Sequence, residues 1–191
     1  MYTPSPYSPR NRWRTFNGLC DTAQMMGERH YAYPDRGDTP YSECVEENAG
    51  SRASSSVERW VAKNLSKAGF EVTRHARVHA SIAPFCGVAP IRLSPDIIVN
   101  RHTVVEVDYP ADGGGGPSHV RGFPARDMVR LDFFRAVGFD TVAVRLGGLE
   151  PIPGHTCVLS DGGITPAVLD ETLAACAVWD FLRQETSQTS L

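Results

Sequence analysis

Hydrophobic residues recur at helical spacing directly after a capping signal in the middle of the chain. Ser55 and Glu58 lie three residues apart, as in a capping box, where each side chain accepts the other residue's amide hydrogen. The apolar residues that then share one face are Val57, Trp60, Val61 and Leu65. Gly69 is typical of a residue just beyond a helix end, so a helix is predicted over 56–68.

Two later segments also predict helices. Residues 125–137 (ARDMVRLDFFRAV) end at a glycine, Gly138. A last helix is expected from Thr165-Pro166 to about Arg183, because proline is favoured at the first helical position. The tail after this helix is expected to fray.

Four segments predict strands. Residues 71–79 alternate between polar and β-branched positions, and residues 140–146 (DTVAVRL) are rich in valine. Residues 96–100 and 103–109 are separated by a tight turn and predict a hairpin. Helices interspersed with these strands predict an α/β fold in which a mixed central sheet is flanked by helices.

Residues 1–53 differ from the rest, which forms one domain over 54–191. This segment holds five of the six tyrosines and several prolines, and it has no helical or strand period. We expect an irregular, extended arm that wraps its own domain or contacts a protein partner. Its basic and aromatic cluster, also suited to contacts with a nucleic acid, is Arg10, Arg12, Trp13 and Arg14.

The charge and composition of the chain exclude several classes of function. The net charge of -3 excludes a binder that attracts nucleic acid by bulk positive charge, but it permits a nuclease whose carboxylates lower the net charge. Five widely spaced cysteines without a C-x-x-C pair argue against a disulfide framework or a zinc knuckle. We see no secretory signal and no apolar run long enough for a membrane helix, so a cytoplasmic protein without a membrane partner is expected.

Three carboxylates converge on the predicted hairpin. Glu106 and Asp108 are two residues apart in a strand and therefore share a face, and the partner strand brings Asp96 to the same end. Close carboxylates repel one another unless a cation lies between them, and hard oxygen ligands favour Mg²⁺ or Mn²⁺. The alternative is that Asp96 caps a turn while the other two lie on the solvent side of an edge strand.

The Pro95-Asp96 pair, followed by Glu106-Val107-Asp108, resembles the PD-(D/E)XK nuclease superfamily, and more closely its very-short-patch-repair-like endonuclease domains. The resemblance covers about residues 54–150 and includes the helix with Glu58 and a strand ending in Arg145. The downstream positions that match the family spacing are Asp127, Arg130, Phe134 and Gly138.

The chain departs from the family pattern at several positions. Tyr109 replaces the glycine after the acidic pair, and Asp108 takes the place of the usual lysine. The nearest histidine downstream is His119, beyond a run of glycines at 113–116 that we interpret as a flap over the site. Arg145 also lies about two residues later than usual.

The resemblance implies a restriction-endonuclease-like fold and a metal-dependent DNA endonuclease or nickase. Asp96, Glu106 and Asp108 would hold Mg²⁺ or Mn²⁺, and Glu58 or His119 would assist proton transfer. The arginines expected to contact DNA phosphates are Arg126, Arg130 and Arg145.

Two alternatives remain open at this point. Arg126 and Arg130 can instead belong to a solvated helix face paired with Asp127 and Asp132. The whole chain can instead be a non-cleaving DNA-binding or assembly subunit built on the same fold. A small-molecule enzyme has little support, because the sequence contains no nucleotide-binding fingerprint and no nucleophile elbow.

Overall fold

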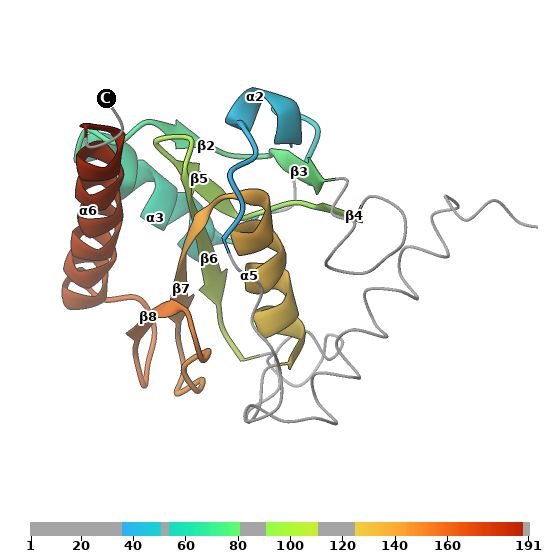
Figure 1. Cartoon of the computed structure of the whole chain (residues 1–191). Coiled ribbons are helices and arrows are strands. Elements are labelled where there is room, and N and C mark those ends of the chain that lie inside the picture. Colours follow the sequence, from blue (N-terminus) through green and yellow to red (C-terminus); the bar gives the residue numbers. More distant parts are fainter. Residues whose placement is uncertain (1–35, 51–53, 81–90, 111–124, 189–191) are drawn as a thin grey trace, which may run out of the picture.

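A five-stranded mixed sheet forms the centre of the protein. The computed structural model describes residues 36–50, 54–80, 91–110 and 125–188 (Figure 1). From one edge to the other, the strands are β2 (Val72–Thr73), β5 (Ile97–Val99), β6 (Thr103–Asp108), β7 (Asp140–Arg145) and β8 (Thr156–Leu159). The β2–β5 and β5–β6 pairs are antiparallel, whereas β6, β7 and β8 run parallel, so the predicted mixed α/β architecture is confirmed.

The β5–β6 hairpin has the tight turn that the sequence predicts. Asn100 and Arg101 adopt positive φ values of 48° and 63°, and the amide of His102 donates to the carbonyl of Val99. Consecutive left-handed residues give a turn whose twist matches that of the flanking strands. The resulting register pairs Ile97 with Val105, which places the residue before β5 opposite the end of β6.

Helices cover both faces of this sheet. The helices are α3 (Ser56–Lys67), α5 (Ala125–Val137) and α6 (Pro166–Gln188), and α5 lies on the opposite face from the other two (Figure 1). Strand β6 alternates accordingly. Val105 packs in the core with α3 and α6, while Val104 packs in the core with α5. By the same alternation, Glu106 and Asp108 face α5.

A second, three-stranded antiparallel sheet lies beside the first. Its order is β1 (Val45–Glu46), β3 (Arg77–Ala80) and β4 (Ile91–Leu93), and a short helix α2 (Tyr41–Cys44) precedes it. The prediction of an irregular segment through residue 53 is therefore wrong for residues 41–46. The single strand predicted over 71–79 is also wrong, because His75 has a φ of 58° and the chain changes sheet there.

The predicted helices are confirmed with small changes at their ends. Ser55 Oγ accepts the amide of Glu58 at 3.0 Å, which caps α3, and α5 has the predicted bounds. Helix α6 continues to Gln188, beyond the end expected near Arg183. Strands β4 and β8 lie in segments for which the sequence pattern predicts neither a helix nor a strand. In the part of the chain that is described, no helix combines the length and apolar character needed to cross a membrane.

Candidate active site

Asp96 and Glu106 are joined across the end of the β5–β6 hairpin. The backbone amide of Asp96 donates to Glu106 Oε1 at 3.3 Å, and Asp96 Oδ2 accepts the amide of Val107 at 2.9 Å. These bonds continue the pairing of the two strands beyond their backbone hydrogen bonds, with carboxylate oxygens as the acceptors in place of backbone carbonyls. They hold the two carboxylates side by side, as the hairpin register predicts.

Helix α5 supplies the counter-charge of Glu106. Arg130 Nε donates to Glu106 Oε2 at 2.7 Å and its Nη2 donates to Oε1 at 3.1 Å, so both carboxylate oxygens are used. Nη2 also donates to the carbonyl of Ser94, and the guanidinium carbon lies 5.5 Å from the ring centre of Phe134. A two-point ion pair of this kind fixes geometry as well as charge.

Asp108 belongs to a second, more deeply buried ion-pair group. Nη1 of Arg145, at the end of β7, donates to Asp108 Oδ2 at 2.9 Å and to Asp127 Oδ2 at 2.7 Å. The Arg145 side chain is fully buried, and its Nε donates to the carbonyl of Glu150 at 3.0 Å. Its Nη2 has no acceptor among the described residues. Arg145 therefore ties the ends of β6 and β7 to the first turn of α5.

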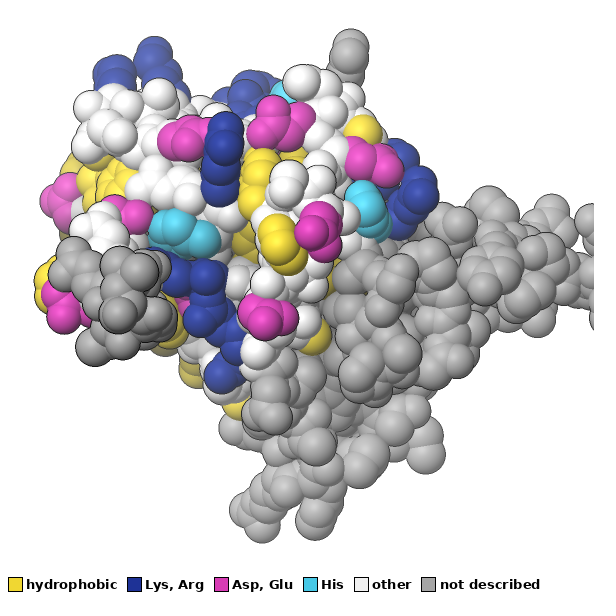
Figure 2. Space-filling view, turned by 45° about the horizontal axis from the view of Figure 1, so that its top comes forward, with side chains coloured by type: hydrophobic (Ala, Val, Ile, Leu, Met, Phe, Trp, Pro, Cys, Tyr) yellow, Lys and Arg dark blue, Asp and Glu magenta, His cyan; other side chains and the backbone are white. Residues whose placement is uncertain are grey.

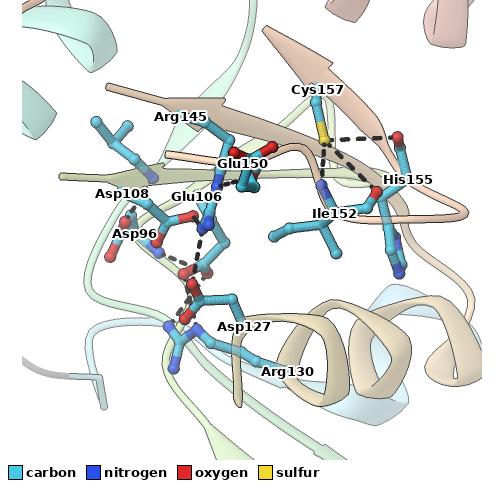
Figure 3. A network of polar contacts seen from close by, with 11 residues as sticks. Asp96, Glu106, Asp108, Asp127, Arg130, Arg145, Glu150, Ile152, His155 and Cys157 are labelled. Atoms are coloured by element: carbon cyan, nitrogen blue, oxygen red, sulfur yellow. Dashed lines mark hydrogen bonds and ion pairs between the residues drawn. The ribbon is translucent and has the colours of Figure 1, made fainter. Parts of the chain in front are cut away.

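The two ion-pair groups lie side by side at the carboxyl end of β6 (Figure 3), and most of their charged side chains line one cavity. The cavity has a volume of about 220 Å³. Its wall consists of Glu58, Asp96, Glu106, Val107, Asp108, Tyr109, Arg126, Asp127 and Arg130. The wall residues come from α3, the β5–β6 hairpin and α5, so segments far apart in sequence meet here.

Negative charge exceeds positive charge in this group. Five carboxylates line the cavity, against two guanidinium groups in its wall and a third, Arg145, behind it. Burial raises the pKa of Asp96 to about 6, although the nearby Arg130 charge opposes the shift. Burial also raises the pKa of Glu106 well above its ordinary value, again against the effect of Arg130. The cavity therefore holds carboxylates that are costly to ionise without a further cation.

The carboxylate oxygens of the cavity are suitable ligands for a hard divalent cation, but arginine side chains already bind several of them. Among the described residues, no three His, Cys, Asp or Glu side chains come together in a way that would hold a metal ion. The reason is visible in the ion pairs, since Arg130 covers both oxygens of Glu106 and Arg145 lies between Asp108 and Asp127. Oxygen ligands and excess negative charge fit Mg²⁺ or Mn²⁺, provided that these side chains rearrange on binding.

Most of the residues predicted for the site meet in this cavity. The structure brings together Glu58, Asp96, Glu106, Asp108, Arg126 and Arg130. The phosphate contact predicted for Arg145 is wrong in this arrangement, because its side chain has no exposed surface. His119 and the glycine run lie outside the described residues, as does the basic cluster of the N-terminal segment.

Asp127 is the site residue that the sequence reasoning did not assign to the cavity. Asp127 and Asp132 were expected, as an alternative, on a solvated face, but both are buried. Asp132 Oδ1 instead accepts from His155 Nε2 at 3.0 Å, and the hydroxyl of Thr141 lies 2.7 Å from the other ring nitrogen. The spacing of Asp127 and Arg130, which places them on neighbouring positions of one helix face, was the available signal.

Searches against known proteins give no independent identification. No protein-family model, no curated protein and no solved structure matches this chain. The resemblance to very-short-patch-repair-like domains therefore rests on the residues of this chain alone.

Proposed function

We propose that this protein is a metal-dependent endonuclease or nickase that hydrolyses DNA phosphodiester bonds. The observation that carries the proposal is the cavity at the end of β6, which gathers Asp96, Glu106 and Asp108 from a hairpin with Glu58 and Asp127 from two helices. Clustered acids with unfavourable ionisation are a recurrent feature of catalytic sites. The restriction-endonuclease-like identity of the fold is part of the same proposal.

Each side chain has a role that follows from its contacts. Arg130 orients Glu106 and offsets its charge, and Arg145 does the same for Asp108 and Asp127 from behind the cavity. Arg126 is exposed at the cavity wall, where it can contact a phosphate of the substrate. Glu58 is the candidate to take up a proton, since its carboxylate lines the cavity and is not among the proposed metal ligands.

The proposed cofactor is Mg²⁺ or Mn²⁺, held by Asp96, Glu106 and Asp108. When bound, such a cation activates water and offsets the charge that develops on a phosphodiester. The surplus of carboxylates over guanidinium groups supports this assignment. The ion pairs of Arg130 and Arg145 must rearrange before all three carboxylates can bind the cation.

Those ion pairs also favour one alternative function. If the arginines neutralise the acids permanently, the cluster is a structural element and the chain is a non-cleaving DNA-binding or assembly subunit. The bidentate Arg130–Glu106 pair is the specific observation behind this alternative.

Cleavage of supercoiled plasmid separates the two functions. The purified protein is incubated with Mg²⁺ or Mn²⁺ beside Asp96→Asn and Glu106→Gln, which keep the size of these side chains and one of their two acceptor oxygens. Asp161→Asn, in an exposed loop, is the matched control. Nicking that is lost in the first two variants and kept in the control supports the nuclease. Absence of any cleavage by the wild type, or wild-type rates in both variants, contradicts it.

A further inference from the structure

Helix α3 has an exposed face of unusual composition. The exposed residues that share this face are Ser56, Arg59, Trp60, Lys63, Ser66 and Lys67. They include both lysines of a chain whose other cations are arginines, and they include no acid. The opposite face of the helix is buried through Val61, Ala62 and Leu65. The orientation of α3 is therefore fixed, and the basic face must point to solvent.

The cations on this face are available for a partner. None of the ion pairs among the described residues involves Lys63 or Lys67. Arg59 uses Nη1 to donate to the carbonyl of Ser54, which leaves its charge unpaired there. Trp60 is 38% exposed although it is a large aromatic residue. Three cations and an indole therefore lie together on one surface without acidic neighbours on the helix face.

Several other basic residues of the described surface are paired with acids. Arg101 pairs with Glu71 at 2.9 Å, while Arg36 and Arg183 both pair with Asp140, at 3.3 and 2.7 Å. On the face shown in Figure 2, lysine and arginine side chains lie beside aspartate and glutamate side chains. That mixed surface is typical of a solvated exterior, whereas the face of α3 is not mixed.

The α3 face also begins at the carboxylate cavity. Glu58, in the first turn of α3, lines the cavity, and Arg59 is the next residue along the helix. Arg59, Lys63 and Lys67 follow at intervals of four residues, or about 6 Å along the helix axis. This row of cations leads away from the cavity with a spacing on the order of that between successive phosphates of an extended strand.

We infer that the face formed by Arg59, Trp60, Lys63 and Lys67 binds a single nucleic-acid strand next to the carboxylate cavity. The inference rests on the proposed function, because it assigns a substrate form to the same site. The three cations contact successive phosphates, and the indole of Trp60 stacks on an unpaired base. A duplex fits less well, because its bases are already stacked on one another and offer no face to the indole.

Binding is measured without cleavage, in EDTA, by fluorescence anisotropy of a labelled 24-nucleotide single strand. The full chain is compared with Lys63→Ser/Lys67→Ser and with a control that also removes two exposed cations, Arg92→Ser/Arg101→Asn. Asparagine is used at 101 because it tolerates the left-handed backbone there. Each protein is titrated at several salt concentrations.

The expected results are specific to the α3 face. The double lysine variant should bind about tenfold more weakly at low salt, and the slope of log K against log salt should fall in magnitude by about 1.4, or 0.7 for each lost contact. Trp60→Ala should weaken binding about tenfold without changing the slope, and Trp60→Phe should restore it. The control should bind like the wild type. DNA and RNA strands of the same sequence, tested in parallel, identify which backbone is preferred.

Two results would overturn the inference. One is wild-type binding by both Lys63→Ser/Lys67→Ser and Trp60→Ala, and the other is an equal loss in the Arg92/Arg101 control. A failure of the nuclease proposal is recognised separately, from hydrolysis of the small diester bis(p-nitrophenyl) phosphate with Mn²⁺. The lysine variants should hydrolyse it at the wild-type rate and Glu106→Gln should not. No hydrolysis by the wild type contradicts the nuclease, while the binding isotherms still decide the role of α3.

Discussion

Arg130 of α5 donates hydrogen bonds to both carboxylate oxygens of Glu106 of β6, at 2.7 and 3.1 Å. This contact joins a helix to the centre of the sheet, and it lies in the wall of the carboxylate cavity. The Glu106 side chain is 5% exposed. Removing either partner therefore leaves the other charge unpaired in a poorly solvated environment.

Arg130→Ala should therefore destabilise the fold. Loss of the guanidinium leaves Glu106 buried and unpaired, and the expected loss of unfolding free energy is about 3 kcal/mol. Urea denaturation of Arg130→Ala, Glu106→Gln and the double variant measures the coupling. The double variant should be more stable than Arg130→Ala alone, because the unpaired charge is gone. Additive losses in the double variant would show that the pair is not coupled.

Asp96 should make the fold less stable as the pH rises. Its pKa is about 6 in the folded protein, above the ordinary value of 3.8, so the unfolded chain loses this proton first. Between pH 4 and pH 6, stability therefore falls by up to about 3 kcal/mol from this group alone. Asp96→Asn retains an acceptor for the Val107 amide and lacks this ionisation.

The comparison is a set of melting temperatures at pH 4, 5, 6 and 7 in EDTA. The stability of Asp96→Asn relative to the wild type should increase mainly between pH 4 and pH 6 and level off between pH 6 and pH 7. A variant that is less stable than the wild type at pH 7, with no change of the difference with pH, would contradict the raised pKa.

Hydrophobic and turn patterns accounted for the part of the fold that carries the carboxylates. Helix α5 and the β5–β6 hairpin form as predicted, because their periods, turn residues and terminal glycine are local signals. Strands β4 and β8 were missed because they are only three and four residues long and each is stabilised by pairing with the preceding strand across a loop. The break at His75 was missed because the alternation of residues 71–79 continues through it.

The site was predictable in part for the same reason. Strand alternation placed Glu106 and Asp108 on one face, and the hairpin register placed Asp96 beside them. The burial of Arg145 is a tertiary effect, since it depends on the parallel pairing of β6 with β7 and on the first turn of α5. No local pattern distinguishes this arginine from one that contacts a phosphate.

Arg145 should prove to be an internal support for the cavity. Arg145→Met removes the charge shared by Asp108 and Asp127 and should cost about 3–5 kcal/mol of unfolding free energy. Adding Asp127→Asn should recover part of that loss, because one of the two unpaired acids is then neutral. Chemical denaturation of the single and double variants tests this, and a loss below about 0.5 kcal/mol for Arg145→Met would contradict it.

A divalent cation should stabilise the folded protein through the acidic cavity. A ligand that binds the native state at a hundred times its dissociation constant adds about 2.7 kcal/mol of stability. The melting temperature should therefore rise with Mn²⁺ in the wild type and change little in Asp108→Asn. An equal rise in both proteins would place the cation elsewhere.

The central claim is that the cavity around Glu106 cleaves phosphodiester bonds. The most direct test is the single-turnover rate of nicking of supercoiled plasmid by the wild type and by Glu106→Gln, at one protein concentration with Mg²⁺ or Mn²⁺. The expected result is metal-dependent nicking by the wild type and a rate at least about 100-fold lower in the variant. Equal rates in the two proteins, or no metal-dependent cleavage by the wild type of either the plasmid or a single-stranded oligonucleotide, would contradict the claim.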